Sequence, residues 1–254
     1  MNKTLLVVLS HNGKSVSEKF LSHFENFTSP DLVSLLWIEN GSSDDTRSFI
    51  GDKKEALDSK YQFDVIYCEE NKGVIGGRNI GFDVFLKKIN IDFSINECDK
   101  IMFLDNDQYV SEGWLEQHIA VLDRGYDIIG VEAWQMTTSF MPVKRCTKRT
   151  EWFSYVGCGG MLMKRTTVEQ VGQFDPIFNP SYFEDPDYCM RCFEKGLKIG
   201  WNCTAKITHV PHQTLGSAPD RMQRFTKSSK LFRDKWRGRQ SLRLVQYHLP
   251  EFDM

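Results

Sequence analysis

The sequence lacks any long hydrophobic run. The longest one near its start, Leu5-Leu6-Val7-Val8-Leu9, has five residues in a chain of 254. An export signal needs a longer apolar core, and a membrane-spanning helix needs about 20 apolar residues. We therefore expect a cytoplasmic protein in which this run is a buried first strand.

A disulfide framework is missing as well, because the seven cysteines are scattered and odd in number. The one close pair, Cys189 and Cys192, has no second pair that would complete a zinc site. A free cysteine behaves as a small hydrophobic residue. We therefore expect reduced thiols that are buried on a helix.

The remaining composition is ordinary for a globular protein, with 41% apolar and 26% charged residues and no internal repeat. Through the first half, β-rich segments alternate with helix-like segments, a pattern typical of parallel α/β proteins. The expected strands are residues 4–9, 33–38, 63–68 and 100–104, and the expected helices are 16–27, 46–57 and 77–88. The pattern predicts one α/β domain over residues 1–216, followed by a basic C-terminal helix within 217–254.

Two carboxylates end the fourth expected strand, in the triplet Asp105-Asn106-Asp107. Open α/β sheets bind their ligands at the carboxyl edge of the strands, where these acids are expected to lie. Carboxylates one residue apart can share a hard divalent cation, since Mg²⁺ and Mn²⁺ prefer oxygen ligands. An ordinary surface turn would show the same residue types.

Polar residues follow two neighbouring strands as well. The second strand ends in Glu39-Asn40-Gly41-Ser42-Ser43-Asp44, which suits a pocket for a polar heterocycle and a ribose. After the third strand, the segment Asn71–Gly81 holds glycines that allow a close backbone approach to a ligand, and Arg78 could face a phosphate. Three polar strand ends on one sheet edge together indicate a nucleotide site.

In this order, these segments and Phe183-Glu184-Asp185-Pro186-Asp187 resemble the motifs of family 2 glycosyltransferases. The resemblance implies the GT-A fold: a Rossmann-like nucleotide-binding sheet flanked by helices, an acceptor-side substructure and, in this chain, the basic C-terminal helix. It implies an inverting hexosyl- or pentosyltransferase with a UDP-, GDP- or dTDP-linked sugar as donor. Mn²⁺ or Mg²⁺ is the implied cofactor.

The resemblance also assigns roles by position. The resemblance implies that eight residues bind the donor, some at its nucleoside and others at its diphosphate and the metal. They are Glu39, Asn40, Asp44, Gly73, Arg78, Asn79, Asp105 and Asn106. Asp107 is the implied metal ligand, with Asp105 and His209 beside it. Asp185 is the implied general base for the acceptor hydroxyl, and Glu184 is the neighbour that could take that role instead.

Several alternatives stay open at this stage. The acids from Glu184 to Asp187 are also what a simple helix start would show, and His209 could be a packed histidine. The whole chain could be a sugar nucleotidyltransferase, although Ser10-His11-Asn12-Gly13-Lys14 is a poor version of the glycine-rich loop that such an enzyme needs. It could also be a non-catalytic module that binds nucleotide sugars or nucleic acid.

Charge is distributed unevenly along the chain, whose net charge is −2. Residues 221–243 hold nine Lys or Arg against one acid, a local charge of +8 that leaves −10 for the remainder. Met222, Phe225, Ser229, Phe232 and Trp236 recur at helical spacing and predict an amphipathic helix. Its basic residues indicate either docking on the acidic domain or attraction to an anionic partner: a glycan, a phospholipid-linked sugar, a membrane surface or nucleic acid.

Overall fold

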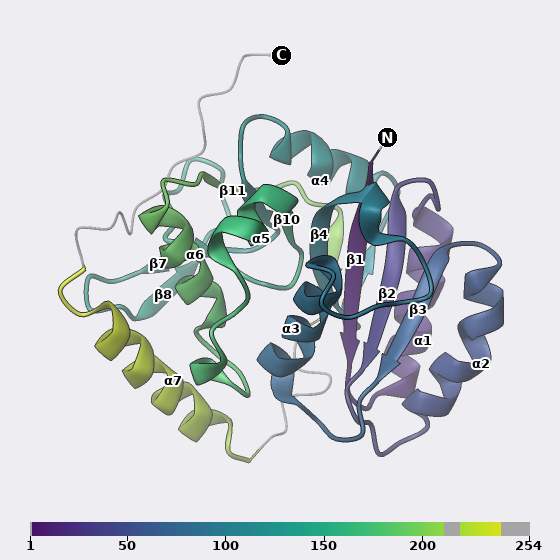
Figure 1. The fold of residues 1–254 in the computed structure, drawn as a ribbon. Helices are drawn as coiled ribbons and strands as arrows, with labels where there is room; N and C mark the ends of the chain where they lie inside the picture. The colour runs from purple at the N-terminus through teal and green to yellow at the C-terminus, as the bar shows by residue number, and fades with distance from the viewer. Residues whose placement is uncertain (1, 211–218, 240–254) are drawn as a thin grey trace.

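A seven-stranded sheet forms the centre of the protein, which we describe from a computed structural model for residues 2–210 and 219–239 (Figure 1). Its strands are β1 (Lys3–Ser10), β2 (Val33–Glu39), β3 (Gln62–Tyr67), β4 (Cys98–Asp105), β6 (Ile128–Gly130), β10 (Met161–Lys164) and β11 (Ile199–Trp201), in the spatial order β11-β6-β10-β4-β1-β2-β3. Strands β1 to β4 run parallel, and β10 is antiparallel to both of its neighbours. The four strands predicted from the sequence are confirmed to within two residues at each end.

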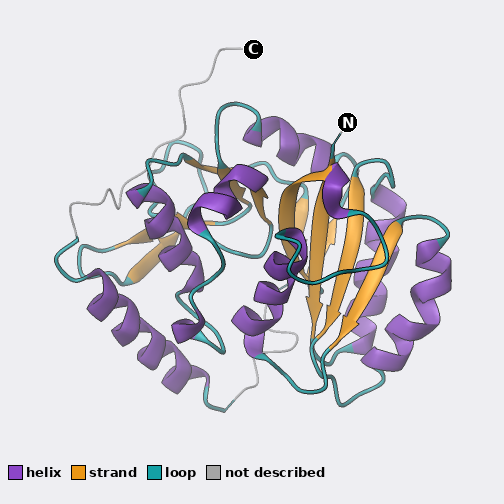
Figure 2. Cartoon of the chain, viewed as in Figure 1, coloured by secondary structure: helices purple, strands orange, loops and turns teal. Residues whose placement is uncertain are grey.

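Helices cover both faces of this sheet (Figure 2). They are α1 (Lys14–Phe27), α2 (Thr46–Asp58), α3 (Gly73–Phe85), α4 (Trp114–Leu122), α5 (Arg165–Val171), α6 (Glu184–Glu194) and α7 (Arg221–Trp236), with short 3₁₀ turns at Ile95–Glu97 and Pro176–Phe178. None of the helices within the described part of the chain is long and apolar enough to cross a membrane.

The first strand shows why a continuous apolar run belongs in the centre of such a sheet. Leu5, Val7 and Leu9 pack with α3 on one face, and Leu6 and Val8 pack with α1 on the other. Each successive side chain points to the opposite face, so a strand covered on both faces must be apolar throughout. The expectation that residues 5–9 are a buried strand is therefore confirmed.

Two small sheets extend the carboxyl side of the central sheet. One pairs β5 (Gln108–Val110) with β12 (Ile207–His209), and the other joins β7 (Ala133–Met136) to β8 (Pro142–Arg145) and β9 (Tyr155–Val156). Each of these small sheets begins just after a strand of the central sheet that is followed by polar residues. They bring residues from the second half of the chain to the edge where β4 ends.

Helix α3 takes in most of the glycine-rich segment. It begins at Gly73, four residues before the expected start, and Gly77 and Gly81 lie inside it, as the sequence predicts. A Cβ at Gly81 would come within 2.8 Å of Val7 Cγ1, and one at Gly77 within 2.5 Å of Leu9 Cδ1. These two glycines allow the helix to pack closely against the sheet. They do not serve a close approach of the backbone to a ligand.

The cysteines follow the prediction. Cys189 and Cys192 are both buried on α6, and the cysteines of the chain are free thiols. Burial raises the pKa of Cys192 to about 12. These thiols are therefore protonated at neutral pH and fill the core between α6 and the sheet.

Candidate active site

A cavity of about 790 Å³ opens at the carboxyl ends of the parallel strands. Nine of the residues predicted from the sequence line it together: Asn40, Gly73, Arg78, Asp105, Asn106, Asp107, Glu184, Asp185 and His209. These residues come from five separate segments of the chain, and the first and last of them are more than 160 positions apart. The topology therefore brings the three polar strand ends, the acidic helix start and the histidine to one site.

Asp107 and His209 are brought together by the small sheet of β5 and β12. His209 pairs with Gln108 across this sheet, and the backbone N–H of Val210 donates to the carbonyl of Asp107. His209 Nε2 then lies 3.5 Å from Asp107 Oδ1, a buried oxygen that accepts no hydrogen bond within the described structure. Burial, and next to it the charge of Asp105, raises the pKa of Asp107 to about 6.

Glu132 contacts His209 at Nδ1, the ring nitrogen that does not face Asp107, and the sequence analysis did not predict this residue. Its Oε1 lies 3.3 Å from His209 Nδ1 and 3.2 Å from the guanidinium of Arg145. Burial would lower the His209 pKa, but the hydrogen bond to Glu132 and the charge of Asp107 outweigh it and raise that pKa. A carboxylate on one ring nitrogen fixes the orientation of the other, as at metal-binding histidines.

These residues fit a divalent cation. An unpartnered buried carboxylate oxygen beside an imidazole nitrogen is a mixed donor pair, which suits Mn²⁺ better than Mg²⁺ because Mg²⁺ takes oxygen ligands. Across the described residues, however, no three His, Cys, Asp or Glu side chains are grouped to hold a metal by themselves. A cation here would need further ligands from a bound anion.

Arg78 is placed differently from its predicted position facing a phosphate. Its guanidinium is buried and lies between two acids, 2.7 and 2.9 Å from the carboxylate oxygens of Asp105 and 3.2 Å from Glu184 Oε1. Burial alone would lower the pKa of Arg78, but the charge of Asp105 raises it. The arginine thus links the end of β4 to the start of α6.

Glu184 and Asp185 form the first turn of α6, which begins after Phe183 in a left-handed conformation (φ 70°). Glu184 points toward Arg78, while Asp185 lines the cavity and faces Gly157, where a Cβ would come 3.9 Å from its Oδ2. Burial first, and then the neighbouring charge of Glu184, raises the pKa of Asp185 well above its ordinary value. Among the described residues, Glu184 pairs with Arg78, whereas Asp185 forms no ion pair with an arginine.

Asn40 and Gly73 build the wall on the side of β2 and β3. The Asn40 side chain donates to Asn71 Oδ1 and to the Gly73 carbonyl and accepts from the N–H of Lys72. Gly73 has a φ of +77°, and a Cβ there would lie 2.8 Å from the Pro180 backbone. Only glycine tolerates that conformation and that approach without strain.

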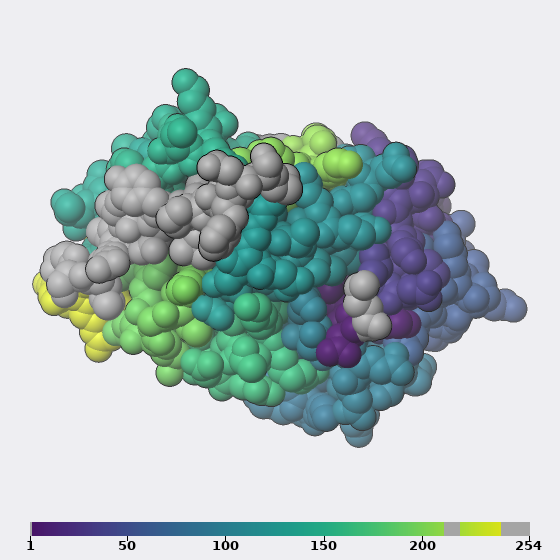
Figure 3. Space-filling view, turned by 90° about the horizontal axis from the view of Figure 1, so that it is seen from above, coloured from purple at the N-terminus to yellow at the C-terminus, as the bar shows by residue number. Residues whose placement is uncertain are grey.

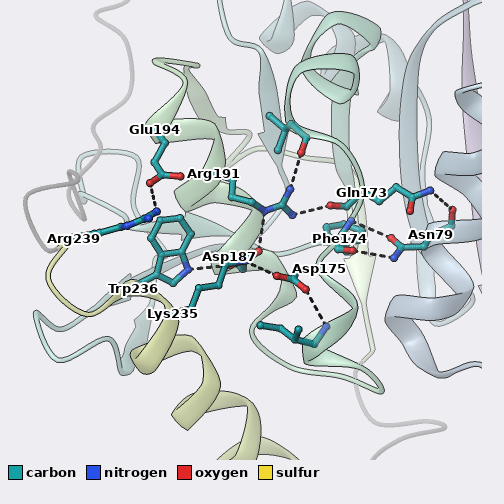
Figure 4. Close-up of polar contacts among 12 residues, drawn as sticks. Asn79, Gln173, Phe174, Asp175, Asp187, Arg191, Glu194, Lys235, Trp236 and Arg239 are labelled. Atoms are coloured by element: carbon teal, nitrogen blue, oxygen red, sulfur yellow. Dashed lines mark hydrogen bonds and ion pairs between the residues drawn. The ribbon is translucent and has the colours of Figure 1, made fainter.

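Three predicted residues lie outside the cavity lining. Glu39 is fully buried and accepts from the N–H of Ser42, and Asp44 accepts from Gly13 and Thr46, which ties together the loops after β1 and β2. Asn79 bonds in both directions with the backbone of Phe174 (Figure 4). Asn106 lines the cavity, but its amide donates to Ser17. His212 and Thr214, noted beside His209 in the sequence, lie outside the described residues.

A comparison with models of protein families identifies the family to which this chain belongs. A model of the family described as Glycosyl transferase family 2 matches residues 6–157, more than half of the chain. The chain belongs to this family. The recognition made from the ordered motifs is thereby confirmed, and the matched region holds the strand-end acids of β2 and β4 together with Arg78.

Solved structures show the same fold. They include GalNAc-T7 with UDP, GalNAc and Mn²⁺ (14% identity, TM-score 0.73, 95% of this chain and 49% of that one), residues 1–349 of S. aureus TarS with UDP-GlcNAc (15%, 0.60, 85% and 61%) and the mannosyltransferase PcManGT of Pyrobaculum calidifontis with GDP-Man and Mn²⁺ (12%, 0.62, 84% and 58%). This family 2 chain spans about half to three fifths of their lengths. The predicted GT-A fold is confirmed, and no curated protein matches the sequence.

Proposed function

We propose that this family 2 protein is a metal-dependent, inverting glycosyltransferase that moves a hexosyl or pentosyl group from a nucleotide sugar to an acceptor hydroxyl. One observation carries the proposal. A single cavity holds, after the end of β4, a buried carboxylate oxygen that lies beside a histidine and accepts no hydrogen bond from the described residues, and a second carboxylate with a raised pKa at the start of α6. The first pair suits the diphosphate end of a donor, and the second suits proton removal.

The donor is proposed to lie along the ends of β1, β2 and β4, against Asn40 and Gly73. Structures of similar fold hold UDP, UDP-GlcNAc or GDP-Man, which supports a nucleoside diphosphate sugar. Asp107 and His209 would hold the cation, and the phosphates of a bound donor would provide further oxygen ligands for it. When bound, the cation would offset the charge on the departing nucleoside diphosphate, where electrostatic stabilisation matters most.

Asp185 is proposed to accept the proton of the acceptor hydroxyl as that oxygen attacks the anomeric carbon. Displacement from the face opposite the diphosphate inverts the anomeric configuration. A carboxylate with a raised pKa is a stronger base than an ordinary aspartate, so its burial favours this step. Arg78 holds Glu184 and Asp105 in place, and we assign it a positioning role.

The base assignment is tested by comparing Asp185→Asn with Glu184→Gln. We expect Asp185→Asn to keep Mn²⁺-dependent nucleotide binding and to lower the rate of sugar transfer by about 10²- to 10⁴-fold, the usual contribution of a general base. Glu184→Gln should retain measurable transfer. If Asp185→Asn transfers sugar at nearly the wild-type rate, the base is Glu184 or another group.

A further inference from the structure

Helix α7 directs two arginines into the cavity instead of presenting all its basic residues to solvent. Arg221, Arg224 and Phe225, from its first two turns, line the cavity and are half-buried. Met222, which the sequence pattern placed on the apolar stripe, is 71% exposed. The outward face of the same helix holds Lys227, Lys230 and Arg233, all exposed. The basic residues of α7 are thus divided between two faces.

The inward arginines lie on the side of the candidate base. Phe225 packs against Tyr182 and Phe183 at ring distances of 5.7 and 5.3 Å, and these residues directly precede Glu184 and Asp185. The proposed donor side, in contrast, lies along the ends of β1, β2 and β4, against Asn40 and Gly73. In Figure 3, α7 (yellow) and the N-terminal strands and helices (purple and blue) lie toward opposite sides of the molecule.

The second half of α7 is anchored beside α6. Trp236 Nε1 donates to Asp187 Oδ1 at 3.0 Å, and Lys235 lies 2.6 Å from the same carboxylate and 2.7 Å from Asp175 (Figure 4). Phe232 is fully buried and packs against Phe183 and Trp236. Asp187 is two residues beyond Asp185, so the anchor fixes the position of α7 relative to the candidate base.

Few acidic side chains among the described residues pair with the two arginines that line the cavity, Arg221 and Arg224. Arg221 forms no ion pair with another described residue, and Arg224 pairs only with Asp220, whose side chain is 43% exposed. Across the cavity, Arg145 extends from β8 and pairs with Glu132 at 3.2 Å. Two aromatic side chains of the cavity lining, Trp134 and Tyr182, offer flat surfaces with a polar atom at the edge, and Tyr182 packs against Phe225 of α7. Guanidinium groups beside aromatic faces suit a sugar or polyol that bears an anion.

From this arrangement we propose that the α7 end of the cavity is an acceptor subsite for a compound that carries a phosphate ester next to its reacting hydroxyl. Arg221, Arg224 and Arg145 would bind the phosphate oxygens, because guanidinium groups match phosphate geometry with paired N–H donors. This inference rests on the proposed function, since it assigns the substrate class of the same site. The proposal gives the cavity-facing arginines of α7 a role in the choice of acceptor.

The test compares two double variants with equal loss of charge. Arg221→Gln/Arg224→Gln alters the cavity face, and Lys227→Gln/Lys230→Gln alters the outward face of the same helix. The dissociation constants of hexose 6-phosphate and unmodified hexose are measured by calorimetry, with and without saturating UDP or GDP and Mn²⁺. Parallel arms use vesicles of phosphatidylcholine with phosphatidylglycerol, which present the phosphate on a lipid, and a single-stranded oligonucleotide.

We expect the wild type and the outward variant to bind the phosphate-bearing compound, free or on vesicles, at least tenfold more tightly than the neutral one. The cavity variant should lose that preference, a loss of about 10- to 100-fold for two charge-assisted contacts. Equal loss in both variants, no preference for phosphate, or oligonucleotide binding that depends on Lys227 and Lys230 would overturn the proposal. So would weaker nucleotide binding in the cavity variant, because the arginines would then serve the donor. Absence of nucleotide binding in the wild type would instead refute the proposed function.

Discussion

Replacement of Arg78 by methionine would test the buried ion pairs that join β4 to α6. The side chain of Arg78 is 5% exposed and that of Glu184 is 8% exposed, whereas Asp105 is 30% exposed. Methionine keeps the aliphatic part of the side chain and removes the charged guanidinium group. Glu184 would then be a buried carboxylate without a positively charged partner among the described residues, and the link between the two elements would be lost.

The expected cost follows from that burial. Removal of one partner of a buried ion pair destabilises a protein by about 3–5 kcal/mol, mostly because the remaining charge is left unpaired. For a protein of this size, each kcal/mol lowers the melting temperature by about 2–4 °C, so the variant should melt about 6–20 °C lower. Burial already raises the pKa of Glu184 with Arg78 in place. The variant's deficit should therefore be smallest near pH 4, where the acid is protonated in both states, and grow as the pH rises.

The assay is urea unfolding of wild type and Arg78→Met between pH 4 and pH 8. The matched control is Arg237→Met, which removes an exposed pair with Asp234 and should cost less than about 1 kcal/mol. If Arg78→Met were as stable as the control at pH 8, or if its deficit did not depend on pH, the three groups would not form the buried link described above.

Two further predictions concern the base and the helix packing. The acid limb of the pH profile of kcat/KM should lie well above pH 4, because transfer needs ionised Asp185. Glu184→Gln removes a neighbouring negative charge and should move that limb to lower pH. If the limb does not move, Glu184 does not raise the pKa of Asp185. Gly81→Ala should lower the free energy of unfolding by about 1–3 kcal/mol through overpacking against Val7. Gly51→Ala is the control: a Cβ there meets only the Tyr67 hydroxyl at 3.5 Å, so we expect no loss, or a gain of about 1 kcal/mol.

The strand ends could be predicted because their pattern is local. A buried apolar run such as residues 100–104, followed directly by Asp105 and Asp107, defines both a strand and the edge at which it stops. Parallel strands then bring several such ends to one side of the sheet. The acidic start of α6 was recognisable in the same way, since its residues are adjacent in the chain.

The partners of those residues could not be predicted, because they depend on packing between distant segments. Arg78 and Glu184 are 106 positions apart, and Glu132 and His209 are 77 apart. Glu132 lies between β6 and β7, and its neighbours in the sequence give no sign of a role. The apolar stripe predicted for α7 is buried at Ser229, Phe232 and Trp236 and half-buried at Phe225, whereas Met222 is exposed. That Arg221 and Arg224 line the cavity could not be predicted, because it depends on where the helix docks. The domain boundary at residue 216 and the individual site roles stay predictions.

The most direct test of the account is thermal unfolding with UDP-, GDP- and dTDP-sugars, each with and without Mn²⁺. A ligand at 100 times its dissociation constant stabilises the native state by about 2.7 kcal/mol. We predict that one nucleotide raises the melting temperature only when Mn²⁺ is present, and that Asp107→Ala and His209→Ala each abolish the shift. An equal shift without Mn²⁺, an undiminished shift in Asp107→Ala, or no shift with any nucleotide would contradict a donor site built on Asp107 and His209.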